Sequence, residues 1–174
     1  SKKSSDRKVN NKICDFLSHN GFQEILTNSI VNSQNYTQDN IVKMMNSLTV
    51  ELDAMRPDMC RSGLEVIDHN INRGQKNLLM YEIGNIYSTS GVGQYHQSSV
   101  LAIWCTGALA PKQWMMNEEK VNIYWLKGVL QNLWIHLGIK KFTIAQDDNT
   151  LTYNVGRDVI AKIQILGKKE LSPI

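Results

Sequence analysis

The chain has 174 residues, a formal net charge of +3 and three cysteines, and this length is sufficient for one domain with a hydrophobic core. The small, dispersed charge argues against a dedicated nucleic-acid-binding arm, and no apolar run is long enough to cross a bilayer. The scattered Cys14, Cys60 and Cys105 do not form a disulfide framework, which favours three buried thiols in a reducing cytoplasm.

The first part of the sequence predicts a helix followed by a strand. Four apolar residues near the N-terminus recur at helical spacing: Val9, Ile13, Phe16 and Leu17. Gly21 is a natural helix stop, because glycine accepts the left-handed conformation. Residues 1–5 are polar and are expected to be disordered. Residues 22–31, rich in β-branched side chains, predict a strand, and the polar residues 32–40 predict a loop or a short helix.

The middle of the chain predicts a second helix and a long β-hairpin. Short strands around a turn are expected over residues 41–45 and 48–55. A helix is expected over residues 62–73, ended by Gly74, and its apolar stripe consists of Leu64, Ile67 and Ile71. Residues 77–90 and 98–107 are two β segments that are apolar at consecutive positions, which predicts central strands covered on both faces.

The strongest helical pattern covers residues 122–138. Its stripe consists of Leu126, Val129, Leu130, Leu133, Trp134 and Leu137. Further strands are expected over residues 140–146, 151–155 and 158–166. Hairpin-linked strands with helices between them predict an α+β fold, a mainly antiparallel β-sheet flanked by helices. No linker divides residues 1–174, which are expected to form one domain, and the start at Ser1 favours a fragment of a longer protein.

Two short motifs have a better structural than catalytic interpretation. Gly91-Val92-Gly93 lacks the third glycine and the following helix of a dinucleotide fingerprint, because position 96 is His96 and a strand follows. A hairpin turn is favoured. Asp147 and Asp148 would point to opposite faces of a strand and could not easily share a metal ion, which favours a solvated turn.

The second helix carries polar residues on one face. His69, Asn72 and Arg73 are three and four positions apart. Proton transfer would need an acid within hydrogen-bond reach, and none is identified. A polar face that packs on a neighbour is favoured. From the residues alone, no catalytic, cofactor-binding or metal-binding residue is identified.

Six segments occur in an order and at a spacing that resemble a known family. They are residues 21–31, 46–56, 63–74, 78–87, 126–138 and 154–163. Together they resemble the beta subunit of bacterial phenylalanyl-tRNA synthetase, over nearly the whole chain from about Asp6. The resemblance is to the catalytic-like region of that subunit, a copy of the class II aminoacyl-tRNA synthetase fold. A local departure is Arg61-Ser62, where the family often has Pro-Gly.

The resemblance implies a domain without adenylation chemistry. Class II enzymes place an arginine just past a Glu-bearing strand, where its guanidinium binds the α-phosphate of ATP and the substrate carboxylate. Glu82–Tyr87 resembles that strand, but Ser88 follows it. Gly156 and Arg157 lie where a third motif would have several glycines. In the family, the alpha subunit uses ATP and magnesium to attach phenylalanine to tRNA, and two alpha and two beta subunits form a cytoplasmic heterotetramer.

The residues around the second helix are then expected to be architectural. Arg56 is expected to anchor the turn before that helix through backbone carbonyls or an acid, with Glu65 and Asp68 as plausible partners. The Asn70–Arg73 end, which includes Asn72, is expected to cap the helix and to meet the strand that follows. Glu82 is a structural candidate on the strand that follows. The alternative to this architectural role is that the residues around the second helix line a cleft.

An apolar association surface is expected if the chain belongs to an assembly. Tyr124, Trp125 and Ile135 lie outside the core-facing stripe of the third helix and are the interface candidates. The first helix and the strand after it are the other candidate, by resemblance to the class II interface unit. Without partners, the chain is expected to self-associate or to expose an apolar patch.

Three hypotheses for function follow. The first is a scaffold that assembles with the alpha subunit and contacts tRNA only through the complete enzyme. The second is a degenerate domain that still binds an adenylate-like ligand, although residues 82–104 contain no arginine to grip phosphate. The third is a module that contacts tRNA directly, which would need a larger basic face than Lys140-Lys141 and Lys168-Lys169 provide.

Overall fold

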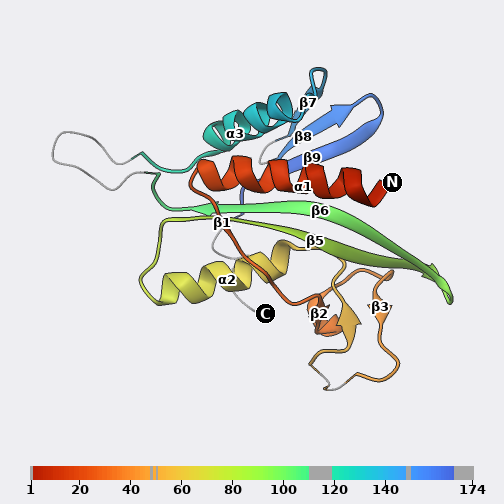
Figure 1. The fold of residues 1–174 in the computed structure, drawn as a ribbon. Coiled ribbons are helices and arrows are strands. Elements are labelled where there is room, and N and C mark those ends of the chain that lie inside the picture. The colour runs from red at the N-terminus through yellow and green to blue at the C-terminus, as the bar shows by residue number, and fades with distance from the viewer. Residues whose placement is uncertain (1, 48, 50, 110–118, 148–149, 167–174) are drawn as a thin grey trace. The chain divides into compact units, whose positions relative to one another are not determined.

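The structure is a computed structural model that describes residues 2–47, 49, 51–109, 119–147 and 150–166. The chain divides into two compact units. The hairpin unit is Gly21–Cys105, and the terminal unit joins Ser1–Asn20 to Thr106–Ile174. The expectation that residues 1–174 form one domain stays a prediction. Within both units the strands are short or hairpin-linked and the helices lie between them, which confirms the predicted α+β class (Figure 1).

In its described residues, the terminal unit contains two helices and an antiparallel sheet. Its elements are α1 (Lys2–His19), α3 (Ile123–His136), β7 (Thr143–Asp147), β8 (Thr150–Val155) and β9 (Asp158–Gln164). The strands follow the order β7-β8-β9, and both pairings are antiparallel. α3 lies beside this sheet (Figure 1). The rings of Trp134 on α3 and Tyr153 on β8 are 6.5 Å apart in an edge-on arrangement, and Leu133 is fully buried. The predicted apolar stripe of α3 is therefore its core-facing side.

The helix α1 begins at Lys2. The expectation that residues 1–5 are disordered stays a prediction. Extending a formed helix by one residue costs far less than nucleating it, and lysine is a good helix former. The predicted stop is confirmed, because Gly21 has a φ of 84° and the backbone N–H of Asn20 closes the last turn on Phe16 and Leu17.

The described part of the hairpin unit contains one helix, a short 3-10 turn and two small sheets. Its elements are β1 (Gln23–Glu24), β2 (Ile30–Val31), η1 (Ser33–Asn35), β3 (Val42–Lys43), β4 (Ala54–Met55), α2 (Cys60–Asn72), β5 (Leu78–Gly91) and β6 (Gln94–Thr106). One sheet has the order β1-β5-β6, and β1 is parallel to β5. The other has the order β2-β4-β3, with both pairs antiparallel. The Gly91–Gly93 hairpin turn is confirmed by the path of β5 into β6 (Figure 1).

Two strand predictions need correction. The single strand expected over residues 22–31 is two strands, because β1 pairs with β5 and β2 pairs with β4 in the other sheet. A single straight strand could not satisfy partners in two sheets. β5 is central, as expected, but β6 lies at the edge of the described sheet, and residues 94–99 are exposed. Those six residues are polar apart from Tyr95, so they lose little by facing water.

Two glycines allow close packing in the hairpin unit. A methyl group on Gly63 of α2 would overlap the indole ring of Trp104 on β6. A methyl group on Gly84 of β5 would overlap the guanidinium of Arg56. The helix thus approaches the hairpin closely, and Arg56 occupies the space that a side chain at position 84 would fill.

A buried ion pair joins three segments of the hairpin unit. Nη2 of Arg56 lies 2.9 Å from Oε1 of Glu82, and both residues are 2% exposed. The other nitrogens of Arg56 donate to the carbonyl oxygen of Asn85 and to the hydroxyl of Thr27, each at 2.8 Å. Oε2 of Glu82 accepts hydrogen bonds from the hydroxyl and the backbone N–H of Thr27, at 2.6 and 3.2 Å. Charges withdrawn from water are stable only when they are paired and hydrogen-bonded in this way.

The partners of Arg56 correct a further expectation. A backbone carbonyl and an acid were expected, and both are present, but the acid is Glu82 rather than Glu65 or Asp68. Glu65 and Asp68 lie on α2, where they pair with residues of the same helix. Sequence proximity favoured them, whereas the hairpin brings Glu82 to Arg56 across 26 positions of the chain.

We expect Leu133→Ala to lower the free energy of unfolding by about 2–5 kcal/mol, because the truncation loses transfer free energy and leaves a cavity. Urea unfolding of the two forms measures the difference. The matched control is Ile135→Ala, which truncates an exposed residue of the same helix and should change stability by less than about 0.5 kcal/mol. Equal effects at the two positions would mean that the stripe does not face the core.

We expect Arg56→Met or Glu82→Leu to cost about 3–5 kcal/mol, because each leaves an unpaired buried charge. The double variant should cost much less than the sum, since it removes both charges. Urea unfolding of the four forms gives the coupling free energy. Additive single effects would contradict the buried pair.

Candidate functional site

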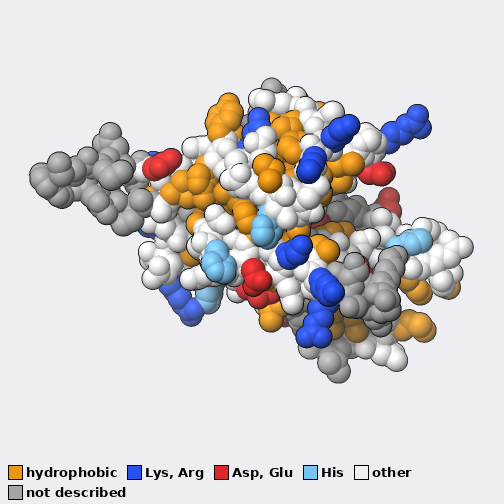
Figure 2. Space-filling model, turned by 45° about the horizontal axis from the view of Figure 1, so that its top comes forward, with side chains coloured by type: hydrophobic (Ala, Val, Ile, Leu, Met, Phe, Trp, Pro, Cys, Tyr) orange, Lys and Arg blue, Asp and Glu red, His pale blue; other side chains and the backbone are white. Residues whose placement is uncertain are grey.

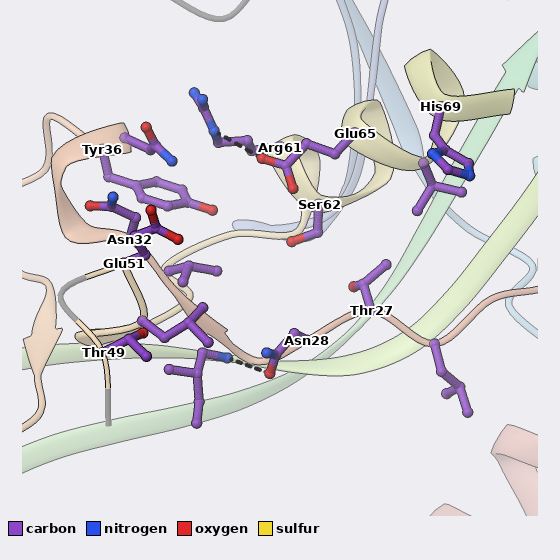
Figure 3. Close-up of a pocket in the computed structure, with 16 residues that line it drawn as sticks. Thr27, Asn28, Asn32, Tyr36, Thr49, Glu51, Arg61, Ser62, Glu65 and His69 are labelled. Atoms are coloured by element: carbon purple, nitrogen blue, oxygen red, sulfur yellow. Dashed lines mark hydrogen bonds and ion pairs between the residues drawn. The ribbon is translucent and has the colours of Figure 1, made fainter. Parts of the chain in front are cut away.

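A pocket of about 820 Å³ lies in the hairpin unit. Its walls come from the segment between β1 and η1, from the residues before β4, and from the first turns of α2 (Figure 3). Apolar side chains form part of the wall: Leu26, Ile30, Val31, Leu52 and Val66. Hydroxyl, amide and charged groups form the rest. A concave site with apolar walls and a few polar groups has the general character of a ligand pocket.

The η1 turn places Tyr36 at this pocket. The side chain of Asn32 caps the turn by accepting the backbone N–H of Gln34 at 2.9 Å. The carboxylate of Asp53 accepts the backbone N–H and the hydroxyl of Ser33, at 2.7 and 2.6 Å. The hydrogen bonds from Ser33 hold the pKa of Asp53 below its ordinary value. Tyr36 then closes the turn by donating its backbone N–H to the carbonyl oxygen of Ser33, and its side chain lines the pocket.

Helical spacing on α2 supplies the opposite wall. Arg61, Ser62, Glu65 and His69 all line the pocket. Nε of Arg61 and Oε1 of Glu65 are 3.3 Å apart and form an ion pair between residues four positions apart on the helix. Burial, with the carboxylates of Asp58 and Glu65 nearby, raises the pKa of Tyr36 to about 12. The phenol therefore stays protonated at neutral pH and can donate a hydrogen bond.

The polar residues at the end of α2 separate into two pairs. Nη1 of Arg73 contacts Nε2 of His69, and the amide of Asn72 donates to Asp68 at 3.1 Å. His69, Asn72 and Arg73 therefore do not form one group. The backbone N–H groups of Arg73 and Gly74 close the helix on Asn70 and Ile71, so the helix ends where the sequence predicted, through backbone bonds.

The three interface candidates on α3 differ in exposure. The side chains of Tyr124 and Ile135 are 71% and 69% exposed, whereas Trp125 is partly buried. Tyr124 and Ile135 are eleven positions apart, so they lie on the same side of the helix. Gly128 lies between them, and nothing lies within 4 Å of the position where its methyl group would be.

Sequence reasoning missed the residues that form the pocket. Tyr36, Ser62 and Glu51 are separated by 11 to 26 positions and have no common motif. Only the fold brings them together. Thr27 was also missed, although it bonds to both members of the buried ion pair. The departure at Arg61-Ser62 from the family's Pro-Gly was the one local signal in this region.

Other functional groups give no further site. Within the described ranges, no three His, Cys, Asp or Glu residues are placed to hold a metal ion, and no helix is long and apolar enough to cross a membrane. The expectation of three buried thiols is wrong for Cys60, which is exposed at the first turn of α2. Burial raises the pKa of Cys105 to about 12, so this thiol is unreactive at neutral pH. Asp148 lies outside the described residues.

Comparisons with known proteins agree with the fold and identify the family of the chain. Residues 1–169 match the family model described as the phenylalanyl tRNA synthetase beta chain CLM domain. The phenylalanine–tRNA ligase beta subunit of Bacteroides fragilis is 29% identical over 186 residues, covering 94% of this chain and 23% of that protein. The corresponding subunit of Bacteroides thetaiotaomicron is 30% identical and covers 76% and 18%. The chain thus spans about a fifth of the length of these relatives.

Solved structures show the same fold at low sequence identity. PylSc of Desulfitobacterium hafniense, a pyrrolysyl tRNA synthetase, has a TM-score of 0.64 and 15% identity, covering 89% of this chain and 54% of that one. An ATP phosphoribosyltransferase regulatory subunit/histidyl-tRNA synthetase of Bacillus halodurans has a TM-score of 0.61 and 11% identity, covering 82% and 36%. These likenesses confirm the class II synthetase-like fold. With the family match over nearly its whole length, the chain belongs to the phenylalanyl-tRNA synthetase beta chain CLM domain family.

Proposed function

We propose that the chain is a non-catalytic scaffold of a phenylalanine–tRNA ligase beta subunit. In this proposal it assembles with an alpha subunit, two of each forming a heterotetramer, and the complete enzyme attaches phenylalanine to tRNA with ATP and magnesium. The names of the relatives support the subunit, and the family match supports the region within it. tRNA contact through the complete enzyme is part of the proposal. The cytoplasmic location stays a prediction.

The observation that best supports the scaffold proposal concerns the lysine and arginine side chains on and beside the hairpin, which would be needed to bind phosphate. β5 and β6 run from Leu78 to Thr106, and this stretch contains no lysine or arginine. Arg56 is the buried arginine beside the hairpin, and each of its three nitrogens already has a protein partner. A guanidinium that binds phosphate must offer free N–H groups. Arg56 is also only 2% exposed, so a nucleotide could reach it only if the contacts around it opened.

The outer side of α3 is the proposed contact with the alpha subunit. Tyr124 and Ile135 expose an aromatic and an aliphatic side chain with Gly128 between them. A glycine in a helix interior costs about 1 kcal/mol relative to alanine, and it allows a partner to approach the backbone. Figure 2 shows one face of the molecule, on which hydrophobic side chains are interspersed with polar and charged ones. Aromatic residues are enriched at the buried centres of interfaces.

A second candidate function is ligand binding, and the pocket of the hairpin unit favours it. Its walls combine apolar side chains with hydroxyl groups. This is compatible with a scaffold, because the pocket and the outer side of α3 belong to different units. Direct binding of tRNA by this chain has no comparable observation in its favour.

We expect Tyr124→Arg with Ile135→Glu to prevent assembly when the variant beta subunit is co-expressed with the alpha subunit. Light scattering after size exclusion should show separated subunits, because the change places charges in an apolar contact. The matched control is Val92→Glu at the exposed tip of the hairpin, which should assemble normally. Normal assembly of the α3 variant would place the contact elsewhere.

We expect the isolated chain to show no phenylalanine-dependent pyrophosphate exchange, since the phosphate-gripping arginine is missing. The complete enzyme serves as the positive control, and a mock purification from the same host excludes contaminating synthetase. Exchange above the mock level would contradict the scaffold proposal.

A further inference from the structure

The rim of the pocket in the hairpin unit carries apolar side chains that face solvent. Leu26, which follows β1, is 86% exposed, and Leu52, which precedes β4, is 38% exposed. Both residues line the pocket. Exposed apolar groups beside a concave surface are typical of interaction sites, because covering them is favourable. A molecule small enough to lie wholly inside the pocket would leave most of Leu26 in water, so the structure favours a longer occupant that crosses the rim.

Three polar groups inside the pocket have no hydrogen-bond partner in the part of the chain that the structure describes. The hydroxyl of Tyr36 and Nε of Arg61 are buried atoms of this kind, although Nε lies 3.3 Å from Glu65 as part of an ion pair. Ser62 is 7% exposed, and its hydroxyl forms no hydrogen bond with a described residue. Figure 3 shows the hydroxyls of Tyr36 and Ser62 pointing toward each other from opposite walls. Unpaired buried polar groups are costly, so these groups favour an occupant with hydrogen-bond acceptors.

The outer edge of β2 forms part of the pocket wall. β2 lies at the edge of the sheet β2-β4-β3, and both Asn28 and Ile30 line the pocket. The carbonyl of Ser29 accepts the backbone N–H of Arg56 beside β4. Because backbone groups alternate in direction along a strand, those of Ile30 point away from β4. Its N–H is bonded to the side chain of Asn28 at 3.0 Å, which leaves its carbonyl as the acceptor for an added extended peptide.

The charges around the pocket favour a basic group on the occupant. Among the lining residues Arg61 is paired with Glu65, which leaves the exposed carboxylate of Glu51. The pKa of Tyr36 is raised first by burial and then by the carboxylate of Asp58, so a further acid lies near the same wall. Opposite charges attract at such short range. A lysine or arginine side chain joins a cationic head to an apolar stem, which suits a pocket with apolar walls.

We propose that this pocket binds an extended segment of a partner protein that carries a lysine or arginine between apolar residues. The basic side chain enters the pocket toward Glu51, and carbonyl oxygens beside it accept from Ser62 and Tyr36. The apolar neighbours cover Leu26 and Leu52, and the backbone of the segment lies along the outer edge of β2. The site goes beyond the scaffold proposal and does not rest on it.

A blocked peptide tests the site in the purified complete enzyme. The probe is acetyl-Ser-Val-Lys-Val-Ser-amide, whose five residues span about 17 Å when extended. It has no free terminal amine or carboxylate, so an excess of phenylalanine should leave its binding unchanged. Saturation-transfer NMR is run to roughly 10 mM, where even a site with a Kd near 1 mM is nearly saturated. The peptide should bind saturably.

Three control molecules show which parts of the probe are recognised. The peptide with glutamate in place of lysine and the peptide with glutamine there should each bind about tenfold more weakly or worse, since they lose a charge-assisted contact. Butylamine keeps the basic group and loses the backbone and the valines. It should also bind at least about tenfold more weakly, because it offers no acceptor to the hydroxyl groups and covers no rim residue.

Variants show whether the bound peptide lies in this pocket. Glu51→Lys reverses the charge of an exposed lining residue and should weaken binding of the lysine peptide by about tenfold. The matched control is Glu24→Lys, at an exposed glutamate of β1 that does not line the pocket, and it should bind as the parent does. Tyr36→Phe with Ser62→Ala removes two hydroxyls and should also weaken binding by about tenfold. A thermal melt of each variant confirms folding.

The contrary results are distinct. Absence of saturable binding of the lysine peptide overturns the site. Equally strong binding of the glutamate or glutamine peptide overturns the role of the basic side chain, and equally strong binding of butylamine overturns the peptide as occupant. Binding that is unchanged by Glu51→Lys places the peptide elsewhere and also overturns the proposal. None of these results bears on assembly with the alpha subunit, which is measured separately.

Discussion

The hairpin unit depends on the buried contact between Arg56 and Glu82. The backbone of Arg56 is tied on both sides, because its N–H donates to Ser29 and its carbonyl accepts from Tyr87. Its side chain bonds to Thr27, Glu82 and Asn85. One residue therefore fixes the segment between β1 and β2, the turn before α2 and the middle of β5. Burial of the charges is expensive, and the cost is offset only if all of these partners are in place at once.

The pocket follows from that contact. α2 begins four positions after Arg56, so the ion pair determines where its first turn lies. Thr27 belongs both to the network and to the pocket wall. Gly84 leaves the space that the guanidinium fills, and Gly63 lets the helix approach Trp104. Arg56 is thereby committed to the architecture of the unit, while hydroxyl groups such as those of Thr27 and Ser62 line the pocket.

Local patterns predicted most of the elements, and long-range partners could not be predicted. The stripe through Leu133 and the stop at Gly21 appear in a few consecutive residues, so the helices and the hairpin were predicted correctly. The division of residues 22–31 between two sheets depends on β4 and β5, which lie far along the chain. For the same reason Glu82 was not paired with Arg56, and Tyr36 and Ser62 were not seen as neighbours of one pocket. The proposed function came from the resemblance, because a domain of the proposed kind has no catalytic motif to detect.

The central claim is that the guanidinium of Arg56 is bound by Glu82 and is closed to nucleotide. A structure of the complete enzyme, determined with a non-hydrolysable phenylalanyl-adenylate analogue, tests it most directly. The account predicts the analogue in the alpha subunit alone, with the contact between Arg56 and Glu82 intact at about 2.9 Å. An analogue bound against β5 and β6 of this chain, with Arg56 released from Glu82 and turned to the phosphate, would contradict it.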